Sequence, residues 1–274
     1  MKITIITINF NNAIGLKKTI KSVIAQNYSD LEYIVVDGGS KDESVKIIKE
    51  YESVINIWLS EGDNGVYHAM NKGIQMATGD YILFLNSGDY FFSSDILNNY
   101  QHHIKEKDLI AFDIKMIGLG HNYIHKHPDE LSFSFLFEET FAHQSIFIKR
   151  KLFDKVGLYD EALKIVADWK FFIHAAVLGS TYKCVHEVLT EFSFGGLSST
   201  VEGTFLRRRE RENVLKAEFA VFYKDYVELR KLKTNRSKML SEIEKTMIGR
   251  KLVSFIFRVY ITLFSKKKLK DIIS

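Results

Sequence analysis

The first 100 residues alternate between short apolar runs and amphipathic segments with helical periodicity, and this alternation restricts the fold more than any other feature. The apolar runs indicate strands over residues 2–10, 31–40, 55–61 and 80–89. The segments between them indicate helices over residues 16–26, 41–51 and 65–79. Strands that are apolar on both faces are typical of a parallel sheet covered by helices on both sides. We therefore predict an α/β fold with a Rossmann-like, mostly parallel central sheet.

Polar or small residues follow each of the four predicted strands at the point where it ends. The four ends are residues 9–11 (NFN), 37–40 (DGGS), 61–63 (EGD) and 86–89 (NSGD). In open sheets of this type, ligands bind beyond the carboxyl ends of the strands. We therefore expect these four ends to line one binding site.

The character of the chain changes after residue 100 and again near residue 200. Residues 108–127 resemble a hairpin, and a helix is predicted from residue 166. From residue 201 to 274 the sequence is charged and helical, with basic clusters at 207–211, 230–233 and 265–270. We predict one domain over residues 1–200 and a helical, basic extension over residues 201–274.

Composition narrows the compartment and the class of partner. Cys184 is the only cysteine, so no disulfide can form within the chain, and the first residues show no secretory signal. We therefore expect a cytoplasmic protein. The net charge of +4 is mild, and the aromatic residues of the basic extension lie on an apolar segment. They are not interleaved as stacking platforms, so we predict no nucleic-acid partner.

Residues 248–264 predict an amphipathic helix whose narrow polar stripe comprises Arg250, Ser254, Arg258 and Thr262. A wide apolar face followed by the lysines of 265–270 suits a helix lying in the membrane interface. We expect residues 248–270 to contact the inner face of the cytoplasmic membrane. The segment is about 17 residues long and interrupted by Arg258, which disfavours a spanning helix. The alternative is packing on the domain or on a second copy of the chain.

Several motifs resemble a known family in their order and spacing. They are "VVDGGSKDES", "FLNSGD", "AHQSIFIKRKLFDKVGLYDE" and "ADWKFF". Over roughly residues 1–200 the chain resembles the inverting family 2 glycosyltransferases of the GT-A fold that build bacterial surface polysaccharides. The resemblance implies transfer of a hexose or N-acetylhexosamine from a nucleotide-diphosphate sugar to a lipid-linked glycan, with inversion. It also implies a UDP-sugar donor, with a GDP-sugar as the alternative, and Mg²⁺ or Mn²⁺ as cofactor.

The resemblance assigns roles to individual residues. Asp89 matches the last carboxylate of the family's metal-binding motif, and Asp168 matches its catalytic base. The residues that it assigns to the donor side are Thr7, Asn9, Asp37, Asp63, Asn71, Asn86 and His143. A divalent ion neutralises the charge that develops on a leaving nucleotide diphosphate, and phosphates and water complete its coordination, so one carboxylate is sufficient. A second carboxylate can take the proton of the attacking hydroxyl.

Plainer roles remain open for the same residues. Asp37, Asp63 and Asp89 occur in turn-forming sequences, and Asp168 could be an ordinary acid at the start of a helix. His143 could be structural, and residues 195–198 could be a loop over the donor or only a loop. Gly38 and Gly88 stand where many relatives have acids, as does Asn86, so metal binding could be weaker and the nucleobase is open.

Two other classes of function compete with a transferase. A nucleotide-sugar-binding or membrane scaffold protein could keep this fold without turnover, and the altered metal motif is the feature that favours it. A dehydrogenase is disfavoured because no G-x-G-x-x-G follows the first strand.

Overall fold

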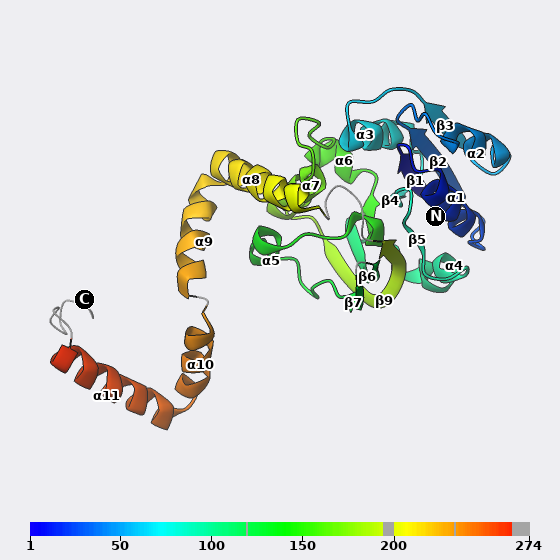
Figure 1. Ribbon diagram of the computed structural model, residues 1–274. Coiled ribbons are helices and arrows are strands. Elements are labelled where there is room, and N and C mark those ends of the chain that lie inside the picture. Colours follow the sequence, from blue (N-terminus) through cyan, green and yellow to red (C-terminus); the bar gives the residue numbers. More distant parts are fainter. Residues whose placement is uncertain (119, 194–199, 233, 265–274) are drawn as a thin grey trace. The chain divides into compact units, whose positions relative to one another are not determined.

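The structure is a computed structural model that describes residues 1–118, 120–193, 200–232 and 234–264. The chain forms two compact units, Met1–Val214 and Leu215–Ser274, which are described separately below (Figure 1). The first unit includes most of helix α8 (Val201–Glu218). The predicted functional boundary at residue 200 stays a prediction.

The predicted alternation of strands and helices in the first 100 residues is confirmed (Figure 1). The strands are β1 (Ile3–Asn9), β2 (Leu31–Asp37), β3 (Ile57–Ser60) and β4 (Tyr81–Phe84). The helices between them are α1 (Ala13–Ile24), α2 (Ser44–Glu50) and α3 (Val66–Met76). The four strands lie in the order β3-β2-β1-β4, and all three pairs are parallel. Their carboxyl ends therefore lie along one edge of the sheet.

Side-chain alternation along β1 explains how helices cover both faces of this parallel part of the sheet. Ile3 and Ile5 belong to the buried cluster that includes Leu16 and Ile20 of α1. Ile6 points the other way, because a Cβ added at Gly73 of α3 would lie 2.5 Å from its side chain. Because successive strand residues face opposite sides, α1 and α3 cover opposite faces.

The rest of the first unit extends the sheet and changes its direction. The further strands are β5 (Tyr90–Phe91), β6 (Leu109–Gly118), β7 (His121–His125), β8 (Ile146–Lys149) and β9 (Tyr182–Ser193). The helices are α4 (Ile96–Tyr100), α5 (Phe133–Glu138), α6 (Leu152–Val156) and α7 (Ala167–Val177). β8 pairs antiparallel with β4 and β6, whereas β6 and β9 are parallel. The predicted β6–β7 hairpin is confirmed.

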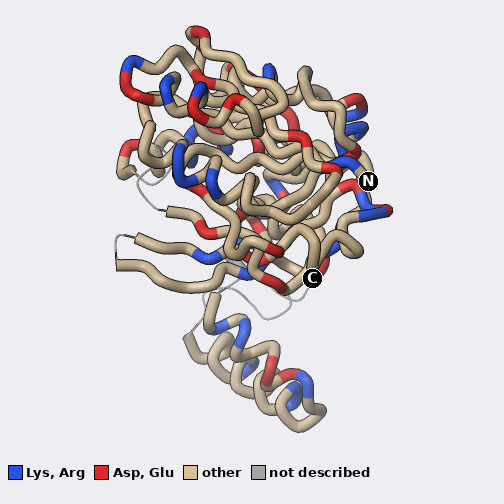
Figure 2. The backbone as a smooth tube through the Cα atoms, turned by 90° about the vertical axis from the view of Figure 1, so that its right-hand side faces the viewer, with Lys and Arg blue, Asp and Glu red and all other residues tan. Residues whose placement is uncertain are grey.

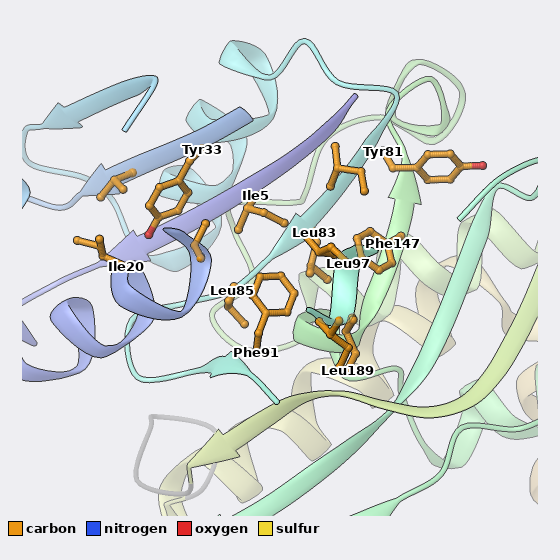
Figure 3. Close-up of a cluster of buried hydrophobic side chains, with 14 of the residues drawn as sticks. Ile5, Ile20, Tyr33, Tyr81, Leu83, Leu85, Phe91, Leu97, Phe147 and Leu189 are labelled. Carbon is orange, nitrogen blue, oxygen red and sulfur yellow. The ribbon is translucent and has the colours of Figure 1, made fainter. Parts of the chain in front are cut away.

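A continuous apolar core joins the two parts of the sheet. In Figure 3, Leu83 and Leu85 from the β4 segment gather with Phe91, Leu97 and Leu189. All five side chains are buried. The two-residue strand β5 follows the turn at residues 86–89 and pairs with β9. This short strand was not predicted, and it ties the turn after β4 to the second part of the sheet.

The second unit is helical, as predicted. Its helices are α9 (Ala220–Leu232), α10 (Asn235–Glu244) and α11 (Met247–Phe264). Basic and acidic residues both occur in α9 and α10, whereas α11 carries Arg250, Lys251 and Arg258 and no acid. Figure 2 marks the two kinds of charged residue along the backbone. No helix within the described ranges is long and apolar enough to cross a bilayer. The lysines of 265–270 lie outside the described residues.

Candidate active site

The ends of β1 and β2 are joined by a closed hydrogen-bond network around Asp37. The Asp37 carboxylate accepts hydrogen bonds from Asn9 Nδ2 (2.7 Å), Ser40 Oγ (2.6 Å), Ser40 N (3.0 Å) and Ser60 Oγ (2.7 Å). Burial alone would raise the pKa of Asp37, but these donors lower it, so the group is ionised. These donors occupy the acceptor sites of a fully buried carboxylate. Asp37 therefore holds together the ends of β1 and β2 at the carboxyl-end edge of the sheet. A donor contact by Asp37 stays a prediction.

Two further residues that were predicted to bind the donor are engaged inside the fold. The Thr7 hydroxyl donates to the Leu85 carbonyl at 2.7 Å and accepts from the Tyr33 hydroxyl at 3.1 Å. Asn71 exchanges hydrogen bonds with the backbone of Tyr159 at 2.9 and 3.0 Å. In this geometry Thr7 ties β1 to the end of β4, and Asn71 ties α3 to the segment that precedes α7.

Asp63 lies against the glycine turn that follows β2. A Cβ added at Gly38 would lie 2.4 Å from Asp63 Oδ2, so this carboxylate fills the space beside Gly38. Asp63 also accepts a hydrogen bond from Gly65 N at 2.9 Å, which fixes the start of α3. The carboxylate of Asp63 is therefore present at the carboxyl-end edge of the sheet, although Gly38 itself has no side chain.

The turn after β4 places Asp89 in a buried position, with 6% of the residue exposed. Gly88 has a φ of +107°, which favours glycine, and the Thr19 hydroxyl links Gly88 N to the Asp89 carbonyl at 3.0 and 2.7 Å. Burial raises the pKa of Asp89 to about 7, while the charge of His143 and a backbone hydrogen bond from Ser193 lower it. Asp89 is thus a buried carboxylate held in place by its own turn.

A chain of side-chain hydrogen bonds joins the end of β4 to the start of α7. Asn86 Nδ2 lies 2.9 Å from His143 Nε2, and His143 Nδ1 lies 3.1 Å from Asp168 Oδ2. Asp168 Oδ1 accepts hydrogen bonds from the Tyr67 hydroxyl (2.9 Å) and from Trp169 N (2.8 Å). The structure therefore brings together three of the predicted site residues, Asn86, His143 and Asp168.

The contact between His143 and Asp168 shifts the pKa values of both groups in this hydrogen-bond chain. Burial opposes charge on both partners, but the hydrogen bond and charge of Asp168 raise the pKa of His143, with a smaller contribution from Asp89. The same contact with His143 and the hydrogen bond from Tyr67 lower the pKa of Asp168 against the effect of burial. Asp168 is thus ionised and oriented by three donors, with its side chain 11% exposed.

Sequence reasoning missed two residues of this site, Tyr67 and Arg211. Burial lowers the pKa of the Arg211 guanidinium to about 10, while the charge of Asp168 opposes that shift. The guanidinium lies 5.0 Å from the Trp169 ring, and within the described chain its buried Nε has no hydrogen-bond partner. Arg211 belongs to the basic cluster 207–211. The sequence does not show which arginine of this cluster reaches the site, whereas the structure places the Arg211 side chain beside Trp169.

The donor groups near Asp89 fit a hard divalent cation. Mg²⁺ and Mn²⁺ take oxygen ligands, and Asp89 is a buried carboxylate. Among the described residues, the buried side-chain Oδ1 of Asn86 has no hydrogen-bond partner, so it is a second oxygen that could bind the cation. The backbone carbonyl of Asn86 is already used, because it accepts a hydrogen bond from Asp89 N at 2.9 Å. Residues 195–198, which were predicted as a loop over the donor, lie outside the described residues.

Comparisons with known proteins identify the family of this chain. The family profile "Glycosyl transferase family 2" matches residues 4–158. An uncharacterised glycosyltransferase of Mycobacterium tuberculosis is 36% identical over 205 residues, which cover 72% of this chain and 77% of that protein. A "PGL/p-HBAD biosynthesis glycosyltransferase" of Mycobacterium bovis is 34% identical over 217 residues, covering 75% and 82% of the two chains.

Solved structures support the GT-A fold. Residues 1–349 of Staphylococcus aureus TarS, in complex with UDP-GlcNAc, superpose with a TM-score of 0.64 at 19% identity, covering 80% of this chain and 68% of that chain. The mannosyltransferase PcManGT of Pyrobaculum calidifontis, in complex with GDP-Man and Mn²⁺, gives 0.56 at 14% identity, covering 97% and 88%. The predicted fold class and the family resemblance are confirmed: this chain belongs to glycosyl transferase family 2 and is a glycosyltransferase.

Proposed function

We propose that the protein transfers a hexose or N-acetylhexosamine from a nucleotide-diphosphate sugar to a lipid-linked glycan, with inversion and with Mg²⁺ or Mn²⁺. The observation that carries the proposal is the cluster of Asp89, His143 and Asp168. It combines a buried carboxylate suited to a cation with an ionised, oriented carboxylate suited to a base. His143 is paired with Asp168 and also acts on Asp89 through its charge.

On the donor side, Asp89 and the carbonyl edge of Asn86 would hold the cation, which when bound neutralises the diphosphate as it leaves. Asn9 and Asp63 would line the nucleotide, since they lie at the ends of β1 and β3. TarS in complex with UDP-GlcNAc and PcManGT in complex with GDP-Man support a nucleotide-sugar donor here. A UDP-sugar is the first candidate and a GDP-sugar the second.

On the acceptor side, Asp168 would take the proton of the attacking hydroxyl. A single displacement assisted by one base inverts the anomeric carbon. Tyr67 and the Trp169 backbone hold the carboxylate by its Oδ1, so Oδ2 faces His143. The hydrogen bond from His143 Nδ1 to Oδ2 lowers the pKa of Asp168 and so helps to keep the base deprotonated before the acceptor binds.

The lipid-linked acceptor and the place in cell-surface polysaccharide synthesis are supported by the relative named for PGL/p-HBAD biosynthesis and by α11. Large apolar side chains of α11 are exposed, among them Ile248, Phe255, Tyr260 and Phe264. An apolar helix face followed by lysines suits anionic lipid at the cytoplasmic membrane surface. Packing on a second copy of the chain is the alternative.

Proton NMR of the transfer reaction tests the proposed reaction. The full chain is incubated with UDP- and GDP-sugars, Mn²⁺ and a polyprenyl-linked glycan acceptor. The proposal expects a new glycosidic bond whose anomeric configuration is opposite to that of the donor, and no product when the metal is chelated. A product with the donor's configuration would refute the assigned mechanism, and donor binding without nucleotide release across many acceptors would favour a non-catalytic binding protein.

Co-sedimentation with vesicles tests the membrane contact. The full chain is expected to bind vesicles containing anionic lipid, and the Phe255→Glu/Tyr260→Glu variant is expected to lose that binding. Met239→Glu on α10 is the matched control, because Met239 is also exposed but lies outside α11. Equal binding by all three proteins, or a dimer that the double variant dissolves, would instead support packing of α11 on protein.

A further inference from the structure

A second group of metal-ligating side chains lies on β6 and β9, outside the set assigned to transfer. Asp113 belongs to β6, and Cys184 and His186 belong to β9. Cys184 and His186 face each other, because Cys184 Sγ lies 3.8 Å from His186 Nδ1. One potential ligand atom from each of the three residues lies within 4.8 Å of the other two.

A β-bulge aims His186 at Asp113. β6 and β9 pair in register up to Phe112 and Val185, but Asp113 pairs with Val188 and Ile114 with Thr190. The extra residues of β9 at this point include His186. Bulges re-aim side chains and are found beside functional sites. The irregularity in the strand thus occurs at the position where the three side chains converge.

The distances match the edges of a tetrahedral site. His186 Nδ1 lies 3.1 and 3.3 Å from the two oxygens of Asp113, and Cys184 Sγ lies 3.8 Å from the same nitrogen. Ligands at about 2.0 Å (N, O) and 2.3 Å (S) from zinc are roughly 3.3 Å apart for N and O and roughly 3.5 Å for N and S. Only small side-chain adjustments would bring all three onto one ion.

A fourth residue supplies the partner that zinc-binding histidines usually have. His186 Nε2 lies 2.9 Å from Asp129 Oδ1, on the side of the ring away from Nδ1. Metal-binding histidines typically donate their second N–H to a carboxylate, which fixes the tautomer and the ring orientation. Asp129 would therefore leave Nδ1 free to bind the ion.

We propose that Asp113, Cys184 and His186 form a zinc site, with Asp129 as its orienting carboxylate and water in the fourth position. The mixed sulfur, nitrogen and oxygen set suits Zn²⁺ and disfavours Mg²⁺, which prefers oxygen ligands alone. Binding converts the Cys184 thiol to a thiolate and releases its proton to solvent. His186 is exposed and gives the ion a path from solvent, while Asp113 is buried. The site would cross-link β6 and β9 at the bulge.

Without a metal, the same contacts are ordinary hydrogen bonds between His186 and the two carboxylates. The two cases differ in the sulfur. Without a metal, Cys184 is a thiol that contacts the His127 carbonyl at 3.6 Å and His186 Nδ1 at 3.8 Å, whereas metal binding makes it a metal-bound thiolate. Cobalt(II) is the appropriate probe, since it replaces zinc in tetrahedral sites and a cobalt–thiolate bond gives a charge-transfer absorption in the near ultraviolet. This readout does not depend on glycosyl transfer.

The experiment titrates the chelator-treated full chain with Co²⁺ and then displaces the cobalt with Zn²⁺. The expected result is a thiolate band that saturates at one cobalt per chain and disappears when zinc displaces that cobalt. Cys184→Ser should abolish the band, and His186→Ala should weaken cobalt binding at least tenfold. Asp89→Ala and His102→Ala should leave the band unchanged, because they remove the proposed donor-site ligand and an exposed histidine elsewhere.

Two results would overturn the proposal. One is a folded wild-type protein that gives no thiolate band with excess cobalt. The other is zinc binding of equal affinity and stoichiometry in the Cys184→Ser/His186→Ala double variant. Circular dichroism of each variant shows whether the fold is retained, and the wild-type titration decides the question even if a variant fails to fold.

Discussion

Replacing Asp168 with asparagine removes the proposed base and keeps the shape of the side chain. The asparagine Oδ1 can still accept the hydrogen bonds from Tyr67 and Trp169 N. The contact with His143 at 3.1 Å loses the negative charge of Asp168, which raises the pKa of His143, so that pKa should fall in the variant. The fold should therefore be retained, with a loss of less than about 3 kcal/mol in the free energy of unfolding.

The effect on catalysis should be much larger than the effect on binding. General-base catalysis contributes about 10²- to 10⁴-fold in rate, or about 3 to 5 kcal/mol of transition-state stabilisation. We expect the transfer rate of Asp168→Asn to fall by that factor, while the Kd for the donor nucleotide with Mn²⁺ stays unchanged. In histidine-selective NMR titrations, the pKa of His143 should fall relative to that of the wild type.

The assay is a single-turnover measurement of transfer, paired with donor titration of the same preparation. Asp154→Asn is the matched control, because Asp154 is an exposed acid at the start of α6 and should transfer at the wild-type rate. Transfer by Asp168→Asn at the wild-type rate would refute the assignment of the base. A weakened Kd with unchanged single-turnover chemistry would show that Asp168 binds the donor.

Three further predictions follow from other parts of the first unit. Glu32 accepts hydrogen bonds from Lys2, Thr4 and Thr78, which lower its pKa to about 2 against the effect of burial. Glu32→Gln should therefore lower the free energy of unfolding at pH 7, measured with denaturant, by about 3 kcal/mol. That difference should diminish as the pH falls from 4.5 towards 2, and a pH-independent difference would contradict it. Gly73→Ala should destabilise by about 1 to 3 kcal/mol in thermal unfolding, because its Cβ would meet a buried isoleucine of β1 at 2.5 Å, and a stabilised variant would refute this packing. The pKa of about 7 for Asp89 predicts that calorimetric Mn²⁺ affinity rises about tenfold per pH unit up to pH 7 and then levels, and a flat profile from pH 5 to 8 would argue against Asp89 as the ligand.

The fold was predictable where local patterns determine it. The alternation of strands and helices over residues 1–90 is local, and so is the placement of polar residues at strand ends. The strand β5 was not predictable, because two residues carry no periodicity and the strand exists only by pairing with β9. The parallel pairing of β6 with β9 likewise joins segments about 70 residues apart.

The candidate site was predictable in part, for a similar reason. Sequence order pointed to Asp89 and Asp168, but it could not show that His143 bridges Asn86 and Asp168. Nor could it show that the hydroxyl of Thr7 is already used inside the sheet. Arg211 follows residue 200, where the predicted domain ends, so the fold alone brings it near Asp168. Which side chains meet across the molecule depends on tertiary packing, and these contacts have no signature in one sequence.

In the proposed mechanism, a divalent cation bound by Asp89 couples nucleotide binding to this site. The measurement that tests it most directly is calorimetric titration of the full chain with UDP and with GDP, each with and without Mn²⁺, repeated with Asp89→Ala. We expect metal-dependent binding of one nucleotide that disappears in the folded variant. Absence of binding by the folded wild type, or equal binding in Asp89→Ala, would contradict it.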